Sequence, residues 1–140
     1  MNVFLDTNIL IDFLSNRWLF SEMAKRVLMT LESKNEPSFY SSTHSYATTY
    51  YVLKKVYPEQ DLRKSLIKLS GLVEIIGVNH LALLNALKDI SFNDFEDGLQ
   101  FHTAKRIPQN IDIIISRNKK DFKSSSIRVL APDEFLLEFG

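Results

Sequence analysis

The chain opens with a short apolar run that ends abruptly in polar residues, Val3-Phe4-Leu5-Asp6-Thr7-Asn8. Consecutive apolar side chains bounded by a polar turn are typical of a strand buried on both faces. The apolar segment 9–14 follows at once, and Thr7 or Asn8 can cap it as a helix. The pattern therefore predicts a strand that passes directly into a helix, with Asp6 at the junction.

The same alternation of short strands and amphipathic helices continues along the chain. The expected strands are 38–41, 72–78, 111–115 and 127–130, and the expected helices are 21–33, 43–56, 59–70, 81–89, 94–106 and a terminal one from Pro132. Parallel neighbours need crossover connections, which the helices would supply. We therefore predict a three-layer α/β/α fold around a central, mainly parallel sheet, in one domain that covers residues 1–140.

Composition restricts the class of protein. Hydrophobic residues make up 45% of the chain, enough for one sizeable core. Lys and Arg number 17 against 17 Asp and Glu, so any polyanion site must be a local patch. The absence of cysteine excludes disulfides, a thiolate zinc site and a cysteine nucleophile. With no signal peptide and no apolar run of about 20 residues, we expect a soluble, cytoplasmic protein without membrane contact.

Polar residues follow two of the predicted strands. Asp6 comes after the first, and Ser116-Arg117-Asn118-Lys119-Lys120-Asp121 comes after strand 111–115. In open parallel sheets the reactive groups gather beyond the carboxyl ends of the strands, so these residues are expected to meet. The alternatives are a capping turn for Asp6 and an ordinary solvated turn for the second group.

A second acidic cluster, Asp94-Phe95-Glu96-Asp97, opens the helix 94–106. Asp94 can serve as its N-cap, because carboxylates are favoured at helix N-termini. Asp97 would lie on a helix face that also carries apolar residues, where a carboxylate is costly unless it is paired or bound to a cation. Asp97 is therefore a candidate metal ligand, and Asp94 stays open between a cap and a ligand.

Four motifs occur in the order and spacing found in PIN domains. They are Asp6-Thr7-Asn8 after an N-terminal strand, Ser42 with Tyr50-Tyr51-Val52-Leu53 on a central helix, Asp94-Phe95-Glu96-Asp97, and Ser116-Arg117-Asn118 after a strand. The chain thus resembles the PIN-domain family over nearly its whole length. The resemblance is strongest to small bacterial members related to the VapC-type toxin ribonucleases of toxin–antitoxin pairs.

The resemblance implies an endoribonuclease that hydrolyses RNA phosphodiesters with Mg²⁺ or Mn²⁺ as cofactor. Asp6 and Asp97 match two of the family's four acidic positions and would be the catalytic metal ligands, supported by Asn8 and Ser116. The central-helix acid falls on Thr48 and the fourth acid on Asn118, which could supply only neutral oxygens. Asp121 or Asp94 is then a candidate for the missing charge.

These departures bear on the metal count. One or two carboxylates with waters and substrate phosphate can hold one Mg²⁺. A two-metal mechanism would need more compensating charge than this set of residues offers.

The family also suggests the partners. Single-stranded or structured RNA is the expected substrate, and an antitoxin and a second copy of the chain are the expected protein partners. Arg117, Lys119 and Lys120 are candidates for contacts with the RNA backbone, their alternative being a solvated basic turn.

Two other functions were weighed against the ribonuclease, and only the first of them fits the sequence. A catalytically weak or inactive PIN-like domain that binds RNA or protein is favoured by Thr48 and Asn118. A phosphoacceptor domain with Asp6 as nucleophile does not fit, because Asn8 stands where a second Asp would be required. The three histidines are not paired at ligand spacing, and of them only His44, on the first turn of the helix 43–56, could approach the site.

Overall fold

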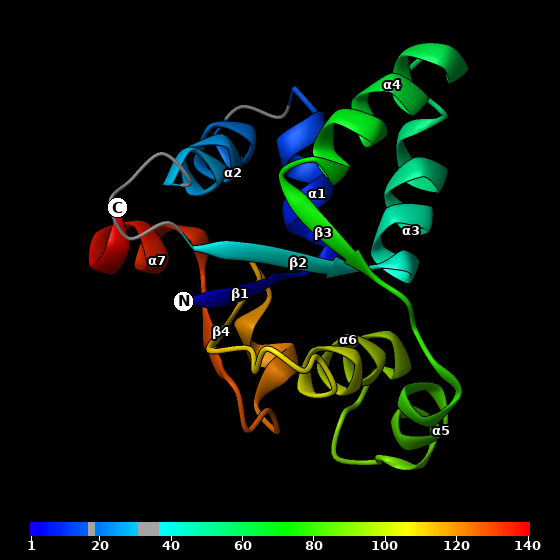
Figure 1. Ribbon diagram of the computed structural model, residues 1–140, viewed down its shortest axis with the longest axis vertical. Coiled ribbons are helices and arrows are strands. Elements are labelled where there is room, and N and C mark those ends of the chain that lie inside the picture. The colour runs from blue at the N-terminus through cyan, green and yellow to red at the C-terminus, as the bar shows by residue number, and fades with distance from the viewer. Residues whose placement is uncertain (17–18, 31–36) are drawn as a thin grey trace.

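The computed structural model describes residues 1–16, 19–30 and 37–140. Within these ranges, five parallel strands form one sheet in the order β3-β2-β1-β4-β5 (Figure 1). The strands are β1 (Asn2–Leu5), β2 (Ser38–Ser42), β3 (Val73–Ile76), β4 (Ile113–Ile115) and β5 (Arg128–Leu130). The predicted sheet is confirmed.

Helices cover both faces of this sheet, as Figure 1 shows. They are α1 (Thr7–Leu14), α2 (Phe20–Met29), α3 (Thr43–Leu53), α4 (Glu59–Ser70), α5 (His80–Lys88), α6 (Phe95–Lys105), the 3₁₀ helix η2 (Lys119–Phe122) and α7 (Pro132–Phe139). One face packs against α1, α2, α3, α4 and α7. The other packs against α6, and α5 rests on α6. The three-layer architecture is therefore as predicted.

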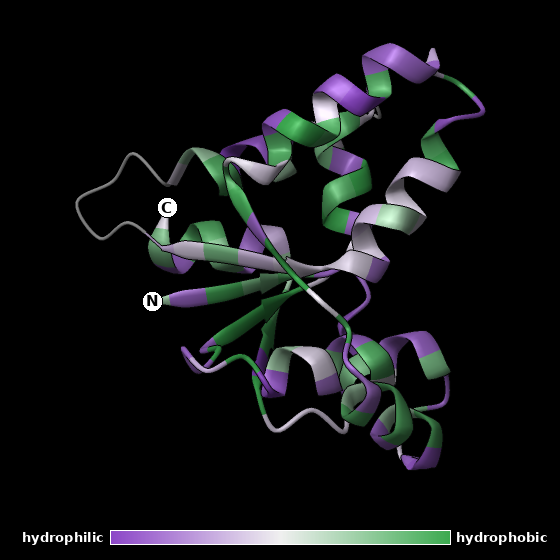
Figure 2. Ribbon diagram, turned by 45° about the vertical axis from the view of Figure 1, so that its right-hand side comes forward, coloured by the Kyte–Doolittle hydropathy of each residue, from purple (hydrophilic) through white to green (hydrophobic). Residues whose placement is uncertain are grey.

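Strands β1 and β4 are apolar on both faces, so Val3-Phe4-Leu5 and 113–115 appear in the sequence as uninterrupted hydrophobic runs (Figure 2). Val3 and Leu5 face the core beneath α1 and α2, whereas Phe4 faces the core beneath α6. The Ile-rich strand divides in the same way, with Ile114 on the α6 side. Period-two alternation thus places each side chain of β1 and β4 in one of two cores.

Some predicted boundaries differ from the structure. α3 ends at Leu53, short of the expected Val56, and β3 and β4 are shorter than their apolar runs. The end of the expected helix 21–33 lies outside the described residues. In the part of the chain that the structure describes, no helix has the length and apolarity needed to span a bilayer.

The predicted cap of the first helix is wrong. Asp6, rather than Thr7 or Asn8, is the N-cap: its backbone is extended and its carboxylate accepts the Thr7 N–H at 2.8 Å. The two expected caps have other partners. The Thr7 hydroxyl donates to Ser45 at 2.9 Å, and the Asn8 amide donates to the Asp6 carboxylate at 3.1 Å.

The strand order determines where a site can form. β1 pairs with β2 on one side and with β4 on the other, so the chain order reverses at β1. Ligands of open α/β sheets bind beyond the carboxyl ends of the strands at such a reversal. Asp6, Ser42 and Ser116 stand at the ends of β1, β2 and β4, and all three are buried.

Candidate metal site

Asp6 is held by four hydrogen bonds although its side chain is only 6% exposed. Oδ1 accepts from the Thr7 N–H at 2.8 Å and from Gln100 Nε2 at 3.3 Å. Oδ2 accepts from Ser116 Oγ at 2.7 Å and from Asn8 Nδ2 at 3.1 Å. Each carboxylate oxygen has two lone pairs, so all four acceptor sites are taken and the orientation of the group is fixed.

A cavity of about 220 Å³ opens beside Asp6. It is also lined by Thr7, Asn8, Ile11, His44, Glu96, Asp97, Gln100 and Asn118. Asp97 is half-buried in the first turn of α6, which brings a second carboxylate to the cavity. The structure therefore brings together Asp6 and Asp97, the two residues predicted as metal ligands.

The cavity concentrates negative charge. Burial raises the pKa of Asp6 above its usual value, although hydrogen bonds from Ser116, Thr7 and Gln100 lower it. Burial, and after it the charge of Asp6, raises the pKa of Asp97 to about 7. Two desolvated carboxylates that line one cavity, with the charge of Asp6 opposing the ionisation of Asp97, favour a bound cation between them.

Asp97 makes the stability of the metal-free protein depend on pH. Its pKa is raised from 3.8 to about 7, so its contribution to stability is fully present below the lower value and is lost as the pH rises through the higher one. In EDTA the melting temperature of the wild type should therefore fall over this interval. Asp97→Asn should flatten this part of the profile. Equal slopes in the two proteins would contradict the assignment.

The residues present fit one hard divalent cation. The carboxylates of Asp6 and Asp97 and the amide oxygen of Asn118 are ligands of the kind that Mg²⁺ and Mn²⁺ prefer. Within the described ranges, no three His, Asp or Glu side chains gather closely enough to hold a metal by themselves. Water and substrate oxygens would have to complete the coordination shell.

The other predicted acidic positions differ in their placement. Asp94 is the N-cap of α6 and accepts the N–H groups of Glu96 at 2.8 Å and Asp97 at 3.3 Å. Asp121 is exposed on η2 and is not among the residues that line the cavity, yet its charge raises the pKa of Asp97. Thr48 is half-buried on α3 and also lies outside the cavity lining.

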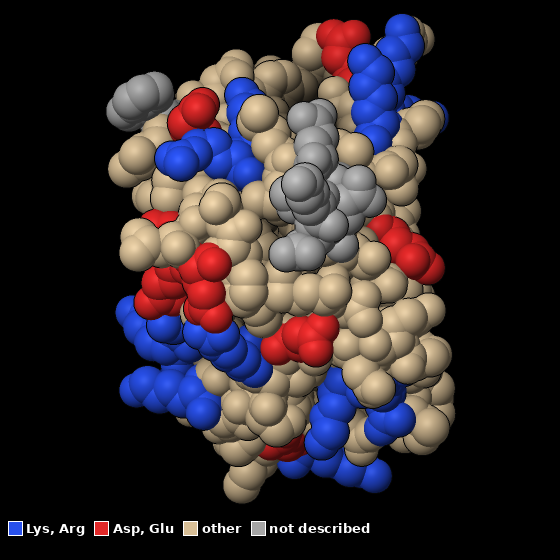
Figure 3. All heavy atoms as spheres, turned by 60° about the vertical axis from the view of Figure 1, so that its left-hand side comes forward, with Lys and Arg blue, Asp and Glu red and all other residues tan. Residues whose placement is uncertain are grey.

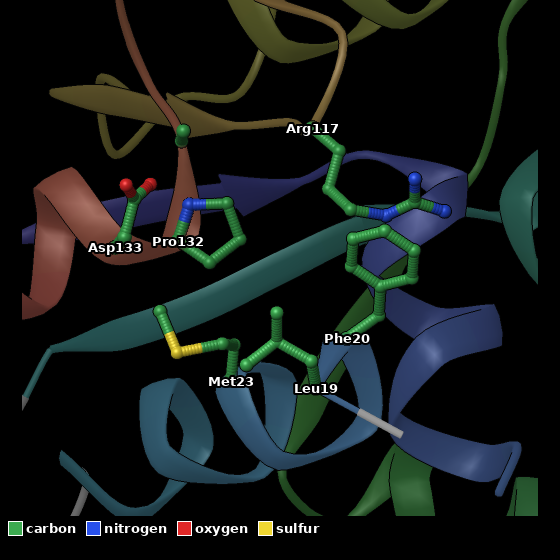
Figure 4. A pocket seen from close by; sticks show the side chains of 7 residues that line it. Leu19, Phe20, Met23, Arg117, Pro132 and Asp133 are labelled. Carbon is green, nitrogen blue, oxygen red and sulfur yellow. The ribbon is translucent and has the colours of Figure 1, made fainter. Parts of the chain in front are cut away.

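Two of the three predicted RNA-binding cations have acidic partners within the protein. The Arg117 guanidinium forms two hydrogen bonds to buried Asp12, at 2.5 and 3.2 Å, and stacks 4.2 Å from the Phe20 ring (Figure 4). Lys119 pairs with Glu134 at 2.9 Å. Lys120 is exposed. Basic and acidic side chains also lie next to one another on the face that Figure 3 shows.

Sequence reasoning missed Gln100 and Ser45 in the hydrogen-bond network around Asp6, and Thr7, Ile11 and Glu96 in the cavity lining. Gln100 lies three residues after Asp97 on the same helix, so helical spacing could have placed both beside the cavity. Ser45 accepts from the Thr7 hydroxyl and from the Gln100 amide. Of the histidines, His44 lines the cavity, whereas His102 bonds to Asp89 at 2.8 Å.

Comparison with known proteins identifies the fold family. The family model of the PIN domain matches residues 2–120, and the chain belongs to the PIN-domain family. Membership of this family points to a nuclease. No curated protein matches the chain significantly.

Three solved structures share the fold. A toxin–antitoxin complex from Klebsiella pneumoniae is 24% identical, with a TM-score of 0.67 over 93% of this chain and 97% of that one. VapBC-1 from nontypeable Haemophilus influenzae is 19% identical, with a TM-score of 0.70 over 95% and 99%. VapC20 of Mycobacterium tuberculosis, a toxin that cleaves the sarcin–ricin loop, is 19% identical, with a TM-score of 0.62 over 80% and 86%.

Proposed function

We propose that this chain is a divalent-metal-dependent endoribonuclease in which Asp6 and Asp97 hold one Mg²⁺ or Mn²⁺. The observation that carries the proposal is the pair of carboxylates from β1 and α6 in one cavity, where the charge of Asp6 raises the pKa of Asp97. Burying two carboxylates together costs free energy when no cation is present, whereas with a divalent cation both can serve as ligands.

The chain's own residues would hold and orient the reacting groups. Ser116 and Asn8 fix the Asp6 carboxylate from one side, and the Thr7 N–H fixes it from the other. Asn118 lines the cavity and has the polar amide to contact a phosphate oxygen or an ordered water. A bound divalent ion would polarise the scissile phosphate and lower the pKa of a water molecule.

RNA is the proposed substrate, and the chain is proposed to be the toxin of a toxin–antitoxin pair. Support comes from the shared fold with VapC20, a toxin that cleaves the sarcin–ricin loop, and with chains of a toxin–antitoxin complex and of VapBC-1. Lys120 is exposed on the turn after β4 and is the proposed contact with the RNA backbone.

Exposed apolar side chains support protein partners, an antitoxin and a second copy of the chain. Leu81 and Leu87 on α5 are more than half exposed, and Ile90 just beyond it is 94% exposed. Contiguous exposed apolar groups often mark interaction sites, and α5 with the residues just beyond it is the proposed one here.

A second function is a PIN domain that binds RNA or protein without cutting it. The placement of Thr48 outside the cavity and the neutral amide of Asn118 favour this alternative, because they leave the site with fewer charges. The two functions differ in metal affinity, which should be weak in the binding domain.

Calorimetric titration of Mn²⁺ and Mg²⁺, followed by incubation with a mixed single-stranded RNA pool, tests the proposal. The wild type should bind about one ion and cut the RNA, and Asp6→Asn, Asp97→Asn should do neither. Asp61→Asn, which changes an exposed aspartate on α4, is the matched control and should behave as the wild type. A wild type that neither binds metal at millimolar concentration nor cuts RNA would leave the non-catalytic domain as the better account.

A further inference from the structure

Gln100 on α6 is a buried polar side chain that contacts both Asp6 and, through Ser45, α3. It is 2% exposed and extends from α6 towards the carboxyl ends of β1 and β2. Its amide nitrogen faces Asp6, Thr7 and Ser45, and its amide oxygen faces Ser42. A buried amide of this kind must satisfy both ends, so its partners determine its orientation.

The hydrogen-bond pattern allows one orientation of the Gln100 amide. The Ser42 hydroxyl oxygen accepts the Ser45 N–H at 3.0 Å, and of the two acceptors beside its own proton, Gln100 Oε1 at 2.7 Å is nearer than Ser45 Oγ at 3.1 Å. A flipped amide would place Oε1 3.3 Å from the Asp6 carboxylate, where two acceptors would repel each other. The NH₂ group therefore points at Asp6.

The Gln100 bond is the longest of the four that Asp6 accepts. It measures 3.3 Å, against 2.7 to 3.1 Å for the other three. The Thr7 N–H belongs to the start of α1, and Ser116 and Asn8 are tied to the turn after β4. Because every acceptor site of Asp6 is taken, a cation can reach the carboxylate only where one donor leaves, and Gln100 is the donor with the weakest hold.

Gln100 can also leave Asp6 without losing a hydrogen bond. Its two amide protons have three acceptors within reach: Asp6 Oδ1, Thr7 Oγ1 at 3.3 Å and Ser45 Oγ. When a cation takes the place on Oδ1, one proton can stay on Ser45 and the other can turn to Thr7. The exchange therefore leaves no buried donor unsatisfied.

We propose that Gln100 is a positioning residue that compensates Asp6 in the cation-free protein and yields its place on Oδ1 to a divalent ion. The proposal rests on the proposed metal site at Asp6 and Asp97. Gln100 acts through Asp6, because its neutral amide holds the carboxylate in place and competes with the ion for one of its lone pairs. The cation affinity of the site is then set partly by this residue.

Two variants of similar length separate competition from added charge. Gln100→Met removes the donor and keeps most of the volume, and Gln100→Glu also adds a carboxylate beside Asp6. Mn²⁺ affinity, measured by calorimetry, should rise about fivefold in Gln100→Met, because the ion no longer displaces a hydrogen bond to the charged carboxylate, which is stronger than the bond to the neutral Thr7 hydroxyl that replaces it. It should rise more than about tenfold in Gln100→Glu. In EDTA both variants should melt below the wild type, and Mn²⁺ should raise their melting temperatures by more than it raises that of the wild type.

Near-UV circular dichroism should show that both variants are folded before their affinities are compared. Affinity in the order Gln100→Glu, Gln100→Met, wild type supports the exchange. Affinity that is unchanged or weaker in Gln100→Met overturns it, even if Gln100→Glu binds more tightly, because added charge alone explains that gain.

RNA cleavage by the wild type distinguishes failure of the proposed ribonuclease from failure of the proposed role of Gln100. A wild type that cuts RNA with Mn²⁺ while all three proteins share one affinity refutes only the role of Gln100. A wild type that neither binds nor cuts, beside variants that bind in the expected order, refutes only the ribonuclease. Binding in none of the three proteins refutes both.

Discussion

Asp6→Asn should lower both Mn²⁺ affinity and RNA cleavage by at least about a hundredfold, since even residues that only support a metal ligand contribute about 10- to 100-fold. The substitution removes the negative charge that attracts the ion. It also puts an NH₂ group, itself a donor, where one oxygen of Asp6 accepts hydrogen bonds. Asn is also an effective N-cap, so the start of α1 should survive. The measurements are Mn²⁺ titration by calorimetry and the initial rate of cleavage of a single-stranded RNA.

Near-UV circular dichroism provides the control for folding in this variant. Asp6→Asn should keep the wild-type spectrum, and Asp61→Asn should keep wild-type affinity and rate. A folded Asp6→Asn variant that still binds Mn²⁺ and cleaves at the wild-type rate would show that the metal site does not include Asp6.

Arg117→Met should destabilise the protein by about 3 kcal/mol, the lower end of the range for breaking a buried ion pair, because the guanidinium is itself 26% exposed. Asp12 is 1% exposed and would lose the guanidinium that pairs with it. Contact with the Phe20 ring would also be lost. A fall of about 10 °C in the melting temperature is the expected readout.

Two further variants make the Arg117 prediction specific. Arg106→Met removes an arginine that no carboxylate pairs with in the described part of the chain, and should change stability by less than about 0.5 kcal/mol. Asp12→Asn combined with Arg117→Met removes the uncompensated charge and should recover most of the loss. If Arg117→Met has the melting temperature of the wild type and only weakens RNA binding, Arg117 is an RNA contact rather than a structural partner of Asp12.

The sequence predicts the fold well because its signals are local. The apolar run before Asp6 and the Ile-rich strand at 113–115 are recognisable without knowledge of their neighbours, since strands buried on both faces are continuously hydrophobic. The Pro58 break likewise marks the start of α4. Helix ends are less predictable: α3 stops at Leu53, whose carbonyl accepts the N–H groups of Val56 and Tyr57 in a turn, although the apolar pattern continues to Val56.

The candidate site is only partly predictable, because its polar network joins residues far apart in the chain. Asp6 and Asp97 follow from their positions at a strand end and a helix start. The contact of Gln100 with Asp6 spans 94 positions, and that of Arg117 with Asp12 spans 105. Arg117 in particular appears in the sequence as one of several turn cations, and only the structure shows that it reaches back to α1.

One carboxylate at the end of β1 starts a helix and also faces the candidate metal cavity. Helix capping needs an acceptor oxygen, which an amide also provides, whereas cation binding needs the charge. A lineage could therefore lose the chemistry at this position through a single substitution and keep an intact, partner-binding scaffold.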